Sequence, residues 1–590
     1  MRKVKMLRRI INCMILLLLT TTAFSQQKTI SGTVKNAKGE PLAGATLSEK
    51  GIVTNSAQTD AQGAFRMVLK GTENALIVSY IGFKEATIAL NGKTSISIVL
   101  EEDSKDLTDV VVIGYQTVKR RKFTGATATI RAKEIENIPA PSIDAMMQGR
   151  LSGVNIQNFS GEPGTQGVVL VRGNTRIARD LNSENPVVSS PLYIIDGIPY
   201  NNDDVAQFQQ TGTNFLAGIN PNDIESIDVL KDASAAAIYG ARGANGVIMI
   251  TTKRPKTGKP TITFNGYYGI TQKPKLREVL AGVEERRTKI DIINSQSSFA
   301  QMQTALPMIL TDSLNPAFNN ATDWQKLFYQ TGLLKNFDLS ATGGSQTANY
   351  RIALGYYDEQ GIIKNYGFTR YSFNSTVNLK PTDKIDIQTI LRYSLIDRKA
   401  GSDSRAAVPL NPGDMPSSLL YLSDVDKEVK LRSSNFLKDT RISHNLNLNT
   451  KASYQLSKEI RLETRAGFSL YPTRRDVFVA GVLNSNGLAS AFSRSTTSYN
   501  ASLTNTITYS KEFLKEHTLL LTAGNSVEYE QNRLTEVGGT NIVSDQIQVV
   551  SGVAKDYLSG RSDMSNRGLL SYFTQLQYDY KGRYIINGFF

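Results

Sequence analysis

Cysteine, histidine and tryptophan are nearly absent from this sequence of 590 residues, which contains one Cys, two His and one Trp. With so few thiols and imidazoles, a zinc site or a Cys–His nucleophile has almost no residues from which to be built. Long apolar runs are also missing, because no stretch reaches the roughly 18 consecutive apolar residues of a membrane-spanning helix. The sequence therefore gives no sign of a metalloenzyme, a cysteine-dependent enzyme or a helical membrane protein.

The charged residues are numerous but not concentrated. The formal net charge is +14, yet five basic residues lie within the first nine positions and the others are scattered. A nucleic-acid-binding face needs a dense basic stripe, so we expect no nucleic acid partner. Hydrophobic residues make up 40% and charged residues 20% of the chain, which excludes wholesale disorder. The 25 Tyr and 22 Phe favour β structure over helical bundles.

The first 25 residues have the pattern of a secretory signal peptide. Positions 1–9 are basic, positions 10–19 are almost wholly apolar, and small residues precede the expected cleavage after Ser25. A membrane anchor is the alternative, but an apolar run of about ten residues is half the length that spans a bilayer. The only cysteine, Cys13, lies in this segment, so we expect no disulfide in the mature chain.

The next region, residues 26–101, alternates between short strands and turns. Residues 30–34 and 64–69 have the pattern of strands, and residues 38–41 and 60–63 contain the Gly, Pro and Asp that turns prefer. This spacing predicts a small β-sandwich.

A charged linker over residues 102–118 contains the β-branched stretch 107–115. Two interpretations of this strand are open. It is either an ordinary strand of the next domain or a strand lent to a partner by edge pairing, in which backbone hydrogen bonds provide the affinity.

Residues 119–255 predict a compact α+β domain, with strands at 168–172 and 224–231 among others and a strand entering a turn at 193–197. The Gly-rich run 240–246 could suggest a phosphate-binding loop. It lacks the Gly-Lys-Ser/Thr ending, and a strand follows it where a helix should, so nucleotide binding is not expected. We interpret its glycines as turn positions and expect Arg242 to pair with a carboxylate that the sequence does not identify.

From Thr261 onward the pattern changes to strands of about ten residues in which apolar and polar residues alternate. Phe337, Leu339 and Ala341, for example, share one face of such a strand. A soluble β-sandwich with one wet face is the alternative. We favour a membrane barrel, because tyrosines gather near the strand ends, as in an aromatic girdle.

The connections in this region are of two kinds. Short polar turns such as 380–383 suit periplasmic hairpins, and long polar stretches at 277–331 and 397–440 suit extracellular loops. About eleven strands can be counted between residues 256 and 590.

Several segments resemble known families. Residues 191–199, 219–227 and 229–248 resemble the plug domain of TonB-dependent receptors of the SusC/RagA type, and residues 39–46 and 78–83 resemble the carboxypeptidase-regulatory-like domain. The resemblance implies a mainly β chain of five parts. These are a signal peptide (1–25), a carboxypeptidase-regulatory-like β-sandwich (26–101), a linker with a TonB-box-like strand (102–118), an α+β plug domain (119–255) and the N-terminal part of a transmembrane antiparallel β-barrel (256–590).

The same resemblance assigns candidate functional residues. The TonB-box-like strand comprises Asp109, Val110, Val111, Val112, Ile113, Gly114 and Tyr115. The structural positions of the plug motif are Arg172, Gly173, Asp196, Gly197, Asp232, Tyr239, Gly240, Arg242, Gly243 and Gly246. No catalytic residue, metal ligand or cofactor is expected, and the ligand-binding residues cannot be named.

The expected plug is too large for a barrel of eleven strands. A compact domain of this size is about 35 Å across, whereas eleven strands enclose a cylinder only about 22 Å wide. A barrel of 22 strands, as the resemblance implies, could hold the plug. We therefore expect the chain to be an N-terminal fragment of a longer receptor.

The resemblance implies TonB-dependent active import of a bulky nutrient, an oligosaccharide or a peptide, across the bacterial outer membrane. The expected partners are TonB with its ExbB/ExbD energy system, a SusD-like surface lipoprotein and outer-membrane lipid. The sandwich and the TonB-box region are expected in the periplasm. Uptake of a siderophore or other metal chelate, a ligand-sensing signalling receptor, and a surface enzyme are the alternatives, and the last is disfavoured because no nucleophile elbow or zinc motif is present.

Overall fold

The computed structural model describes residues 29–590 with gaps. The longer gaps are residues 70–74, 101–109, 120–124, 174–189, 201–214, 297–305 and 400–414, and the shorter ones are 37–38, 51, 81–82, 84–85, 91–92, 114–115, 137, 141, 159–160, 166, 233–235, 434, 485 and 515. The predicted signal peptide lies outside the described residues. The chain divides into two compact units, residues 1–110 and 111–590.

The first unit is the predicted β-sandwich. Its described strands are β1 (Thr29–Asn36), β2 (Thr46–Glu49), β3 (Ile52–Gln58), β4 (Ala64–Val68), β5 (Ala75–Ser79), β6 (Ala86–Ala89) and β7 (Ser95–Leu100). They form two sheets, in the orders β4-β1-β7 and β3-β2-β5-β6. Apolar side chains from both sheets, such as Ile30, Leu47 and Leu76, are fully buried in one shared core. The alternating pattern of these short strands thus identified the fold of this unit correctly.

Two short strands follow in the linker. β8 (Val110–Ile113) and β9 (Gln116–Lys119) pair only with each other, in a sheet of two strands. An isolated two-stranded hairpin is marginally stable at best, so the pairing of β8 with β9 is expected to open easily.

The predicted plug is an α+β domain built on a mixed sheet in the order β10-β15-β16-β13-β14. Its described elements are β10 (Thr127–Arg131), α2 (Ala132–Ile135), α3 (Ile143–Met147), β11 (Val154–Gln157), β12 (Val168–Val171), β13 (Leu192–Ile195), β14 (Ile198–Tyr200), η2 (Phe215–Gly218), η3 (Pro221–Asp223), β15 (Ile224–Leu230), η4 (Ala237–Gly243) and β16 (Val247–Thr252). Ile130, Ile143, Ile156, Ile227 and Ile248 are buried in its main core. β10, the first strand of this domain in the sequence, lies at one edge of the sheet.

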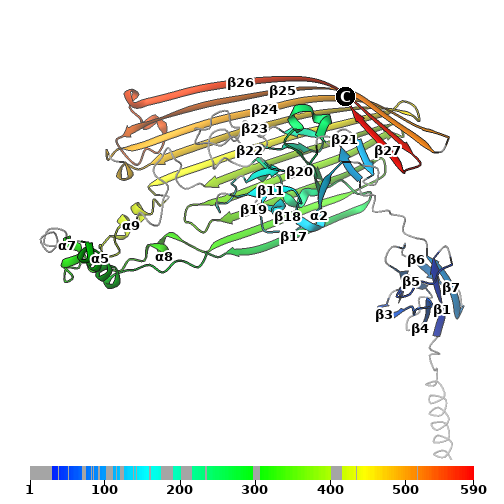
Figure 1. The fold of residues 1–590 in the computed structure, drawn as a ribbon, viewed down its shortest axis with the longest axis horizontal. Coiled ribbons are helices and arrows are strands. Elements are labelled where there is room, and N and C mark those ends of the chain that lie inside the picture. Colours follow the sequence, from blue (N-terminus) through cyan, green and yellow to red (C-terminus); the bar gives the residue numbers. More distant parts are fainter. Residues whose placement is uncertain are drawn as a thin grey trace, which may run out of the picture. The chain divides into compact units, whose positions relative to one another are not determined.

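The rest of the chain forms one long antiparallel sheet, which we call the wall (Figure 1). Its strands are β17 (Gly258–Thr271), β18 (Gly332–Gly344), β19 (Ala348–Gln360), β20 (Gly367–Thr382), β21 (Ile385–Lys399), β22 (Leu437–Gln455), β23 (Ile460–Val479), β24 (Ala489–Phe513), β25 (His517–Ile542), β26 (Leu558–Tyr580) and β27 (Tyr584–Phe589). Each strand pairs with its neighbours in the sequence, and β17 and β27 are the edges. The expected eleven strands are confirmed, but many are longer than expected, and β24 has 25 residues.

The two faces of the wall have opposite character. In β24 the large apolar residues Leu503 and Ile507 are exposed, whereas Ser502, Thr504 and Thr506 between them are buried. The buried polar residues lie on the face that carries the plug, which we call the inner face. This arrangement, with apolar side chains on the outer face and polar side chains on the inner face, is the reverse of a soluble sandwich and is typical of the wall of a membrane barrel.

The wall's long connections contain short helices, which the sequence analysis interpreted only as polar loops. α5 (Val283–Gln296), α7 (Met308–Thr311) and α8 (Trp324–Phe328) lie between β17 and β18, and α9 (Asp424–Lys430) lies between β21 and β22. The remaining short helices are η6 (Gly481–Leu483), η7 (Val550–Gly552) and η8 (Lys555–Tyr557). Among the described residues, no helix has both the length and the apolar character needed to cross a membrane.

Candidate functional site

The candidate site is the contact surface between the plug and the inner face of the wall. Its clearest contact joins Arg242 of η4 to Glu528 of β25. The guanidinium donates from NH1 to Oε2 at 2.6 Å and from NH2 to Oε1 at 2.8 Å. Such two-point pairs fix geometry as well as charge. The structure thus supplies the carboxylate partner of Arg242 that the sequence left open, and it lies on the wall.

Three further ion pairs cross the surface in the opposite sense, with arginines on the wall and carboxylates on the plug. Arg351 of β19 donates to Asp223 at 2.7 Å, and both side chains are less than a tenth exposed. Arg398 of β21, which is fully buried, donates to Glu162 at 2.8 Å. The third pair joins Arg392 to Asp196, and it too is almost completely buried.

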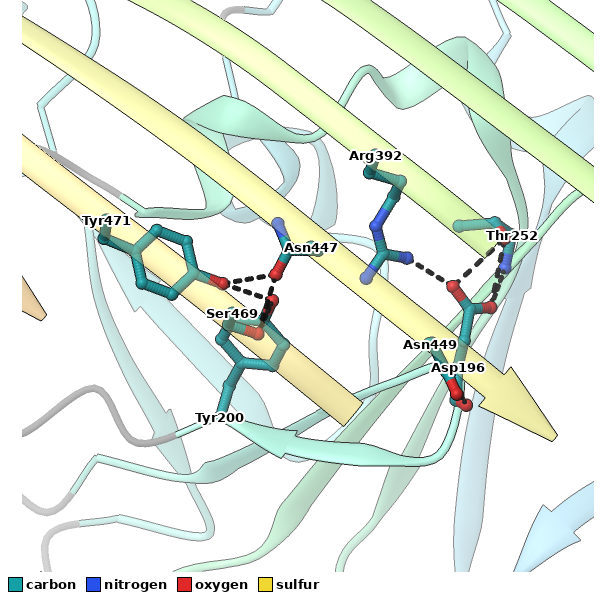
Figure 2. A network of polar contacts seen from close by, with 8 residues as sticks. All are labelled: Asp196, Tyr200, Thr252, Arg392, Asn447, Asn449, Ser469 and Tyr471. Atoms are coloured by element: carbon teal, nitrogen blue, oxygen red, sulfur yellow. Dashed lines mark hydrogen bonds and ion pairs between the residues drawn. The ribbon is translucent and has the colours of Figure 1, made fainter. Parts of the chain in front are cut away.

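Asp196 sits at a sharp turn (Figure 2). It forms with Gly197 the two-residue connection between β13 and β14, and both residues have positive φ, at 50° and 85°. An Asp-Gly pair is well suited to such a hairpin turn. The turn aims the Asp196 carboxylate at Arg392, while the same carboxylate accepts hydrogen bonds from the backbone and side chain of Thr252, at 2.9 and 3.0 Å. The carboxylate therefore ties β16 of the plug to β21 of the wall.

Neutral polar contacts lie beside this pair (Figure 2). Tyr200 of β14 contacts the hydroxyls of Ser469 and Tyr471 on β23, and both wall residues also donate to the Asn447 side chain on β22. Asn449 donates to the backbone carbonyl of Asp196 at 2.9 Å. One short hairpin of the plug is thus bonded to three successive wall strands, β21, β22 and β23.

A second group of contacts surrounds η3. Asn220 and Asn222 both donate to the carboxylate of Asp338 on β18. Arg370 of β20, almost completely buried, donates to the backbone carbonyls of Ala217 and Ile219. These contacts bond the plug to β18 and β20, which are among the first strands of the wall.

The remaining plug-motif residues lie inside the plug. Arg172 and Gly173 follow β12 directly, and both have positive φ. The Asp232 carboxylate accepts a hydrogen bond from the Ala126 amide at 2.7 Å, which links the entry of β10 to the end of β15. Tyr239 is buried in a small core with Leu192 and Met249. The contacts described for these positions are all within the plug.

The three glycines of the motif differ in role. Gly240 and Gly246 have positive φ, at 58° and 88°, as expected of turn positions. Gly243 does not have positive φ, but its carbonyl accepts a hydrogen bond from the Gly246 amide at 2.9 Å, so it is the first residue of that turn. A Cβ at Gly243 would lie 2.7 Å from the Ala236 carbonyl oxygen, so this position also requires close packing.

The TonB-box-like strand is described only in part. Val110, Val111, Val112 and Ile113 make up β8, whereas Asp109, Gly114 and Tyr115 lie outside the described residues. The structure does not place this strand in the contact surface between plug and wall.

Sequence reasoning missed the wall's half of the site. Arg351, Arg392 and Glu528 occupy inward positions between apolar or aromatic outward neighbours, whereas Arg398, also inward, lies between the charged residues Asp397 and Lys399. A charged residue at an inward position was the available signal. It could not name a partner, because Glu528 is 286 residues from Arg242.

Ion pairs and hydrogen bonds make up much of the contact surface, and a small apolar cluster, in which Ala217 of the plug packs with Phe368 and Ile396 of the wall, adds to them. Polar groups separated from one another can be resolvated by water, whereas separating two apolar surfaces costs free energy in proportion to the area exposed. This surface can therefore hold the plug in a defined position and still release it when an external force is applied.

Comparison with known proteins supports this description. Residues 119–247 match the TonB-dependent Receptor Plug Domain, and residues 30–112 match the CarboxypepD_reg-like domain. TonB-dependent receptor P26 of Formosa agariphila is 30% identical over 586 residues, covering 94% of this chain and 55% of that protein. TonB-dependent receptor SusC of Bacteroides thetaiotaomicron is 34% identical over 365 residues, covering 62% of this chain and 33% of that protein.

The fold is shared with a solved structure, that of the RagAB peptide transporter. The superposition has a TM-score of 0.65 at 25% identity and covers 78% of this chain and 54% of the other. The chain spans about half the length of the curated relatives P26 and P3. By these matches, the chain is similar over most of its length to TonB-dependent receptors of the SusC/RagA type.

Proposed function

We propose that this chain takes part in TonB-dependent import of a bulky nutrient, an oligosaccharide or a peptide, across the outer membrane. The plug blocks diffusion through the barrel, ligand is captured on the loop side, and a pull from the periplasm moves the plug. The outer membrane has no nucleotide supply, so the energy arrives mechanically.

The observation that carries the proposal is the order of weak and strong attachments along the chain. β8 pairs only with β9, in a hairpin of marginal stability. β10 comes next and occupies the edge of the plug sheet, where it pairs with β15 alone. Beyond it lie the plug carboxylates that are bonded to the wall.

This order suits a pull on the N-terminal side. β8 can exchange its weak partner for an edge of TonB, because strand addition relies on backbone hydrogen bonds that any extended segment can offer. Several such bonds loaded together along a strand can bear force. The force then reaches β10 first, while the ion pairs at Asp196 and Asp223 hold the rest of the plug.

The proposed partner on the outer side is a SusD-like surface lipoprotein. The fold is shared with the RagAB peptide transporter, and the sequence is similar to that of the TonB-dependent receptor SusC. The peptide carried by the first of these supports a peptide as cargo, and an oligosaccharide is the other cargo that the sequence resemblance implies. These matches do not decide between the two.

Deleting residues 107–115 tests the proposal. We expect nutrient uptake by cells to fall to background while binding of the same nutrient to the purified receptor is unchanged. Uptake at the normal rate would refute the mechanism.

A milder pair of variants tests strand addition itself. Val112→Pro removes a backbone donor and disfavours pairing, whereas Val112→Thr keeps a β-branched side chain and the backbone N–H. We expect the proline variant alone to lose uptake. Equal uptake by both variants would argue against a lent strand.

A further inference from the structure

The outer face of the wall, which is the face opposite the plug, carries a band of mostly apolar side chains. On β25 this band runs from Leu519 to Tyr529. Its members Leu521, Val527 and Tyr529 are each more than a third exposed. The ten residue steps between its ends correspond to about 34 Å along the strand, or about 26 Å across a membrane at a strand tilt near 40°. Since the lipid-facing band of a barrel is about 25 Å tall, this band has the length needed to cross the membrane.

The band ends in tyrosines at the loop end of the strands. Tyr529 and Tyr499 of β24 lie with their ring centroids 5.9 Å apart. The connections at this end, such as 480–488 and 543–557, are longer than the turns at the other end, such as 514–516. In outer-membrane barrels the longer connections are extracellular, and tyrosines mark the boundary between membrane and water. Tyr529 thus marks the outer boundary of the membrane.

Arg533 lies just beyond this boundary. It follows Tyr529 by four residues on the same face of β25, and its side chain is exposed. Four residues of a tilted strand place it about 10 Å further from the membrane centre. Because the headgroup layer adds several Å to each side of the hydrocarbon core, a long side chain at this height reaches the lipid phosphates.

The outward side chains around Arg533 are uncharged. Its neighbours across the strands are Thr497 of β24 and Met564 of β26. The outward residues one step further along the three strands are Ser495, Tyr499, Gln531, Thr535, Ser562 and Asn566. The guanidinium lies near the Tyr499 hydroxyl and makes a weak contact from NH2 to the Met564 sulfur, at 3.9 Å. In the part of the chain that the structure describes, no carboxylate pairs with Arg533, whereas the hydroxyls and amides around it can donate hydrogen bonds to an anion.

Other outward cations at this end of the wall are paired with carboxylates. Arg474 of β23 donates from Nε to Asp476 at 2.7 Å, although two thirds of its side chain is exposed. Lys335 of β18 lies 3.6 Å from Asp358. Of these three cations, Arg533 is the one that has no carboxylate partner among the described residues, so its charge is available to an anion from outside the chain.

We propose that Arg533 binds the phosphate group of a lipid in the outer leaflet of the membrane, while the acyl chains of that lipid lie on the apolar band between Leu519 and Tyr529. A guanidinium can donate two parallel hydrogen bonds to one phosphate, which fixes the headgroup as well as attracting it. The proposal depends on the wall lying in a membrane and goes beyond the import function, because it holds whichever nutrient is imported.

The test measures lipid binding to the full-length receptor, purified in an uncharged detergent, by native mass spectrometry. The two probes are dioleoyl phosphatidic acid and dioleoylglycerol, which differ only in the phosphate group. We expect the phosphatidic acid to bind more tightly than the dioleoylglycerol, and its binding to weaken as salt is raised. Inorganic phosphate is the competitor, because it has the charged group without the acyl chains.

Matched arginine variants locate the site. Arg533→Gln removes the charge and should weaken the binding of phosphatidic acid by about tenfold or more. Arg533→Lys keeps the charge but loses the two-point hydrogen bonding, so it should weaken binding less. Arg474→Gln is the control, because Arg474 is exposed on the same face but is already paired with Asp476. This control should bind phosphatidic acid as the unmodified receptor does.

Three results would overturn the proposal. Equal binding of the two probes would show that the phosphate is not recognised. Equal effects of Arg533→Gln and Arg474→Gln would show that Arg533 is only one of several solvated surface charges. Displacement of phosphatidic acid by an equal concentration of inorganic phosphate would show a site for the free anion rather than for a lipid. The import function is tested separately by the deletion of residues 107–115, so a failure of either proposal can be told from a failure of the other.

Discussion

The guanidinium of Arg242 in the plug donates two hydrogen bonds, of 2.6 and 2.8 Å, to the carboxylate of Glu528 on β25, across the contact surface between plug and wall. The plug residue lies in a Gly-rich turn, and the wall residue lies at an inward position of a long strand. Within the part of the chain that the structure describes, the pair is one of four ion pairs that bond the two parts together.

Glu528→Gln should loosen the plug. The variant leaves the Arg242 guanidinium without its charge partner, at an expected cost of about 1.5–3 kcal/mol. The measurement is the urea concentration at which a buried plug cysteine, introduced as Val229→Cys, becomes reactive. Val229 is fully buried, and the only native cysteine lies in the predicted signal peptide, so labelling reports plug opening.

The exchanged pair, Arg242→Glu with Glu528→Arg, serves as the control. It restores opposite charges at the same place and should recover part of the lost stability. If the double variant loses as much plug stability as the two single variants together, the two residues have no specific interaction with each other.

Asp196→Asn should be more disruptive than its small change in shape suggests. Asparagine tolerates the left-handed backbone of this turn, but it leaves the buried Arg392 unpaired, at about 3–5 kcal/mol. We expect plug opening at a clearly lower urea concentration, measured with the same cysteine. Adding Arg392→Gln to Asp196→Asn should recover some stability, because no buried charge then remains; a further loss would contradict this explanation.

Gly246→Ala and Gly240→Ala should differ, although both glycines have positive φ. A Cβ at Gly246 would lie 2.9 Å from Val171 Cβ, whereas at Gly240 it would meet no atom within 4 Å. The backbone cost is roughly 1 kcal/mol at Gly246 and about 1–3 kcal/mol at Gly240, whose φ of 58° and ψ of −147° suit almost only glycine. Only Gly246→Ala adds a clash with a β-branched core residue. A loss of plug stability in Gly246→Ala no larger than its backbone cost, measured by urea titration, would show that the core at Val171 adapts freely.

The connection between two outer loops should depend on pH. Glu285 of α5 accepts hydrogen bonds from Ser417 Oγ at 2.6 Å and from the Ser418 amide at 3.0 Å, and it pairs with Lys289 at 2.5 Å. Burial raises the pKa of this carboxyl, but the hydrogen bonds and Lys289 outweigh it and hold the pKa below the ordinary value of 4.5.

A lowered folded-state pKa means that this stabilisation is fully present above pH 4.5 and is lost as the pH falls through the folded value. Hydrogen exchange at the Ser418 amide, corrected for the intrinsic rate, should therefore lose protection in acid. Glu285→Gln should remove that dependence. Protection that is unchanged by acid in the unmodified protein would contradict the assignment.

The sequence predicted the strands of the wall better than the side-chain contacts between plug and wall, and the reasons are physical. Alternation in segments such as that around Leu503 follows directly from burial on one face of a strand, so eleven strands could be counted. The lengths of these strands could not be predicted, because the strand ends that extend beyond the apolar band are polar on both faces and resemble loops. The Asp196-Gly197 turn was also readable, since few residue pairs suit two consecutive positive φ values.

The partners across the plug surface were not readable. Inward arginines such as Arg351 and Arg398 stand in strands far from Asp223 and Glu162 in the sequence, and the strand pattern carries no information about the plug's orientation. The helix α5 was missed because Val283–Gln296 is mostly polar and lacks a clear apolar stripe.

The central claim is that the plug must move against the wall for nutrient to pass. Asn222 of the plug contacts Asp338 of β18, so Asn222→Cys with Asp338→Cys allows a short, reducible thiol cross-link between them. We predict that cells carrying the cross-linked receptor bind nutrient but do not take it up, and that chemical reduction of the cross-link restores uptake. Uptake at the normal rate with the cross-link intact would contradict the account.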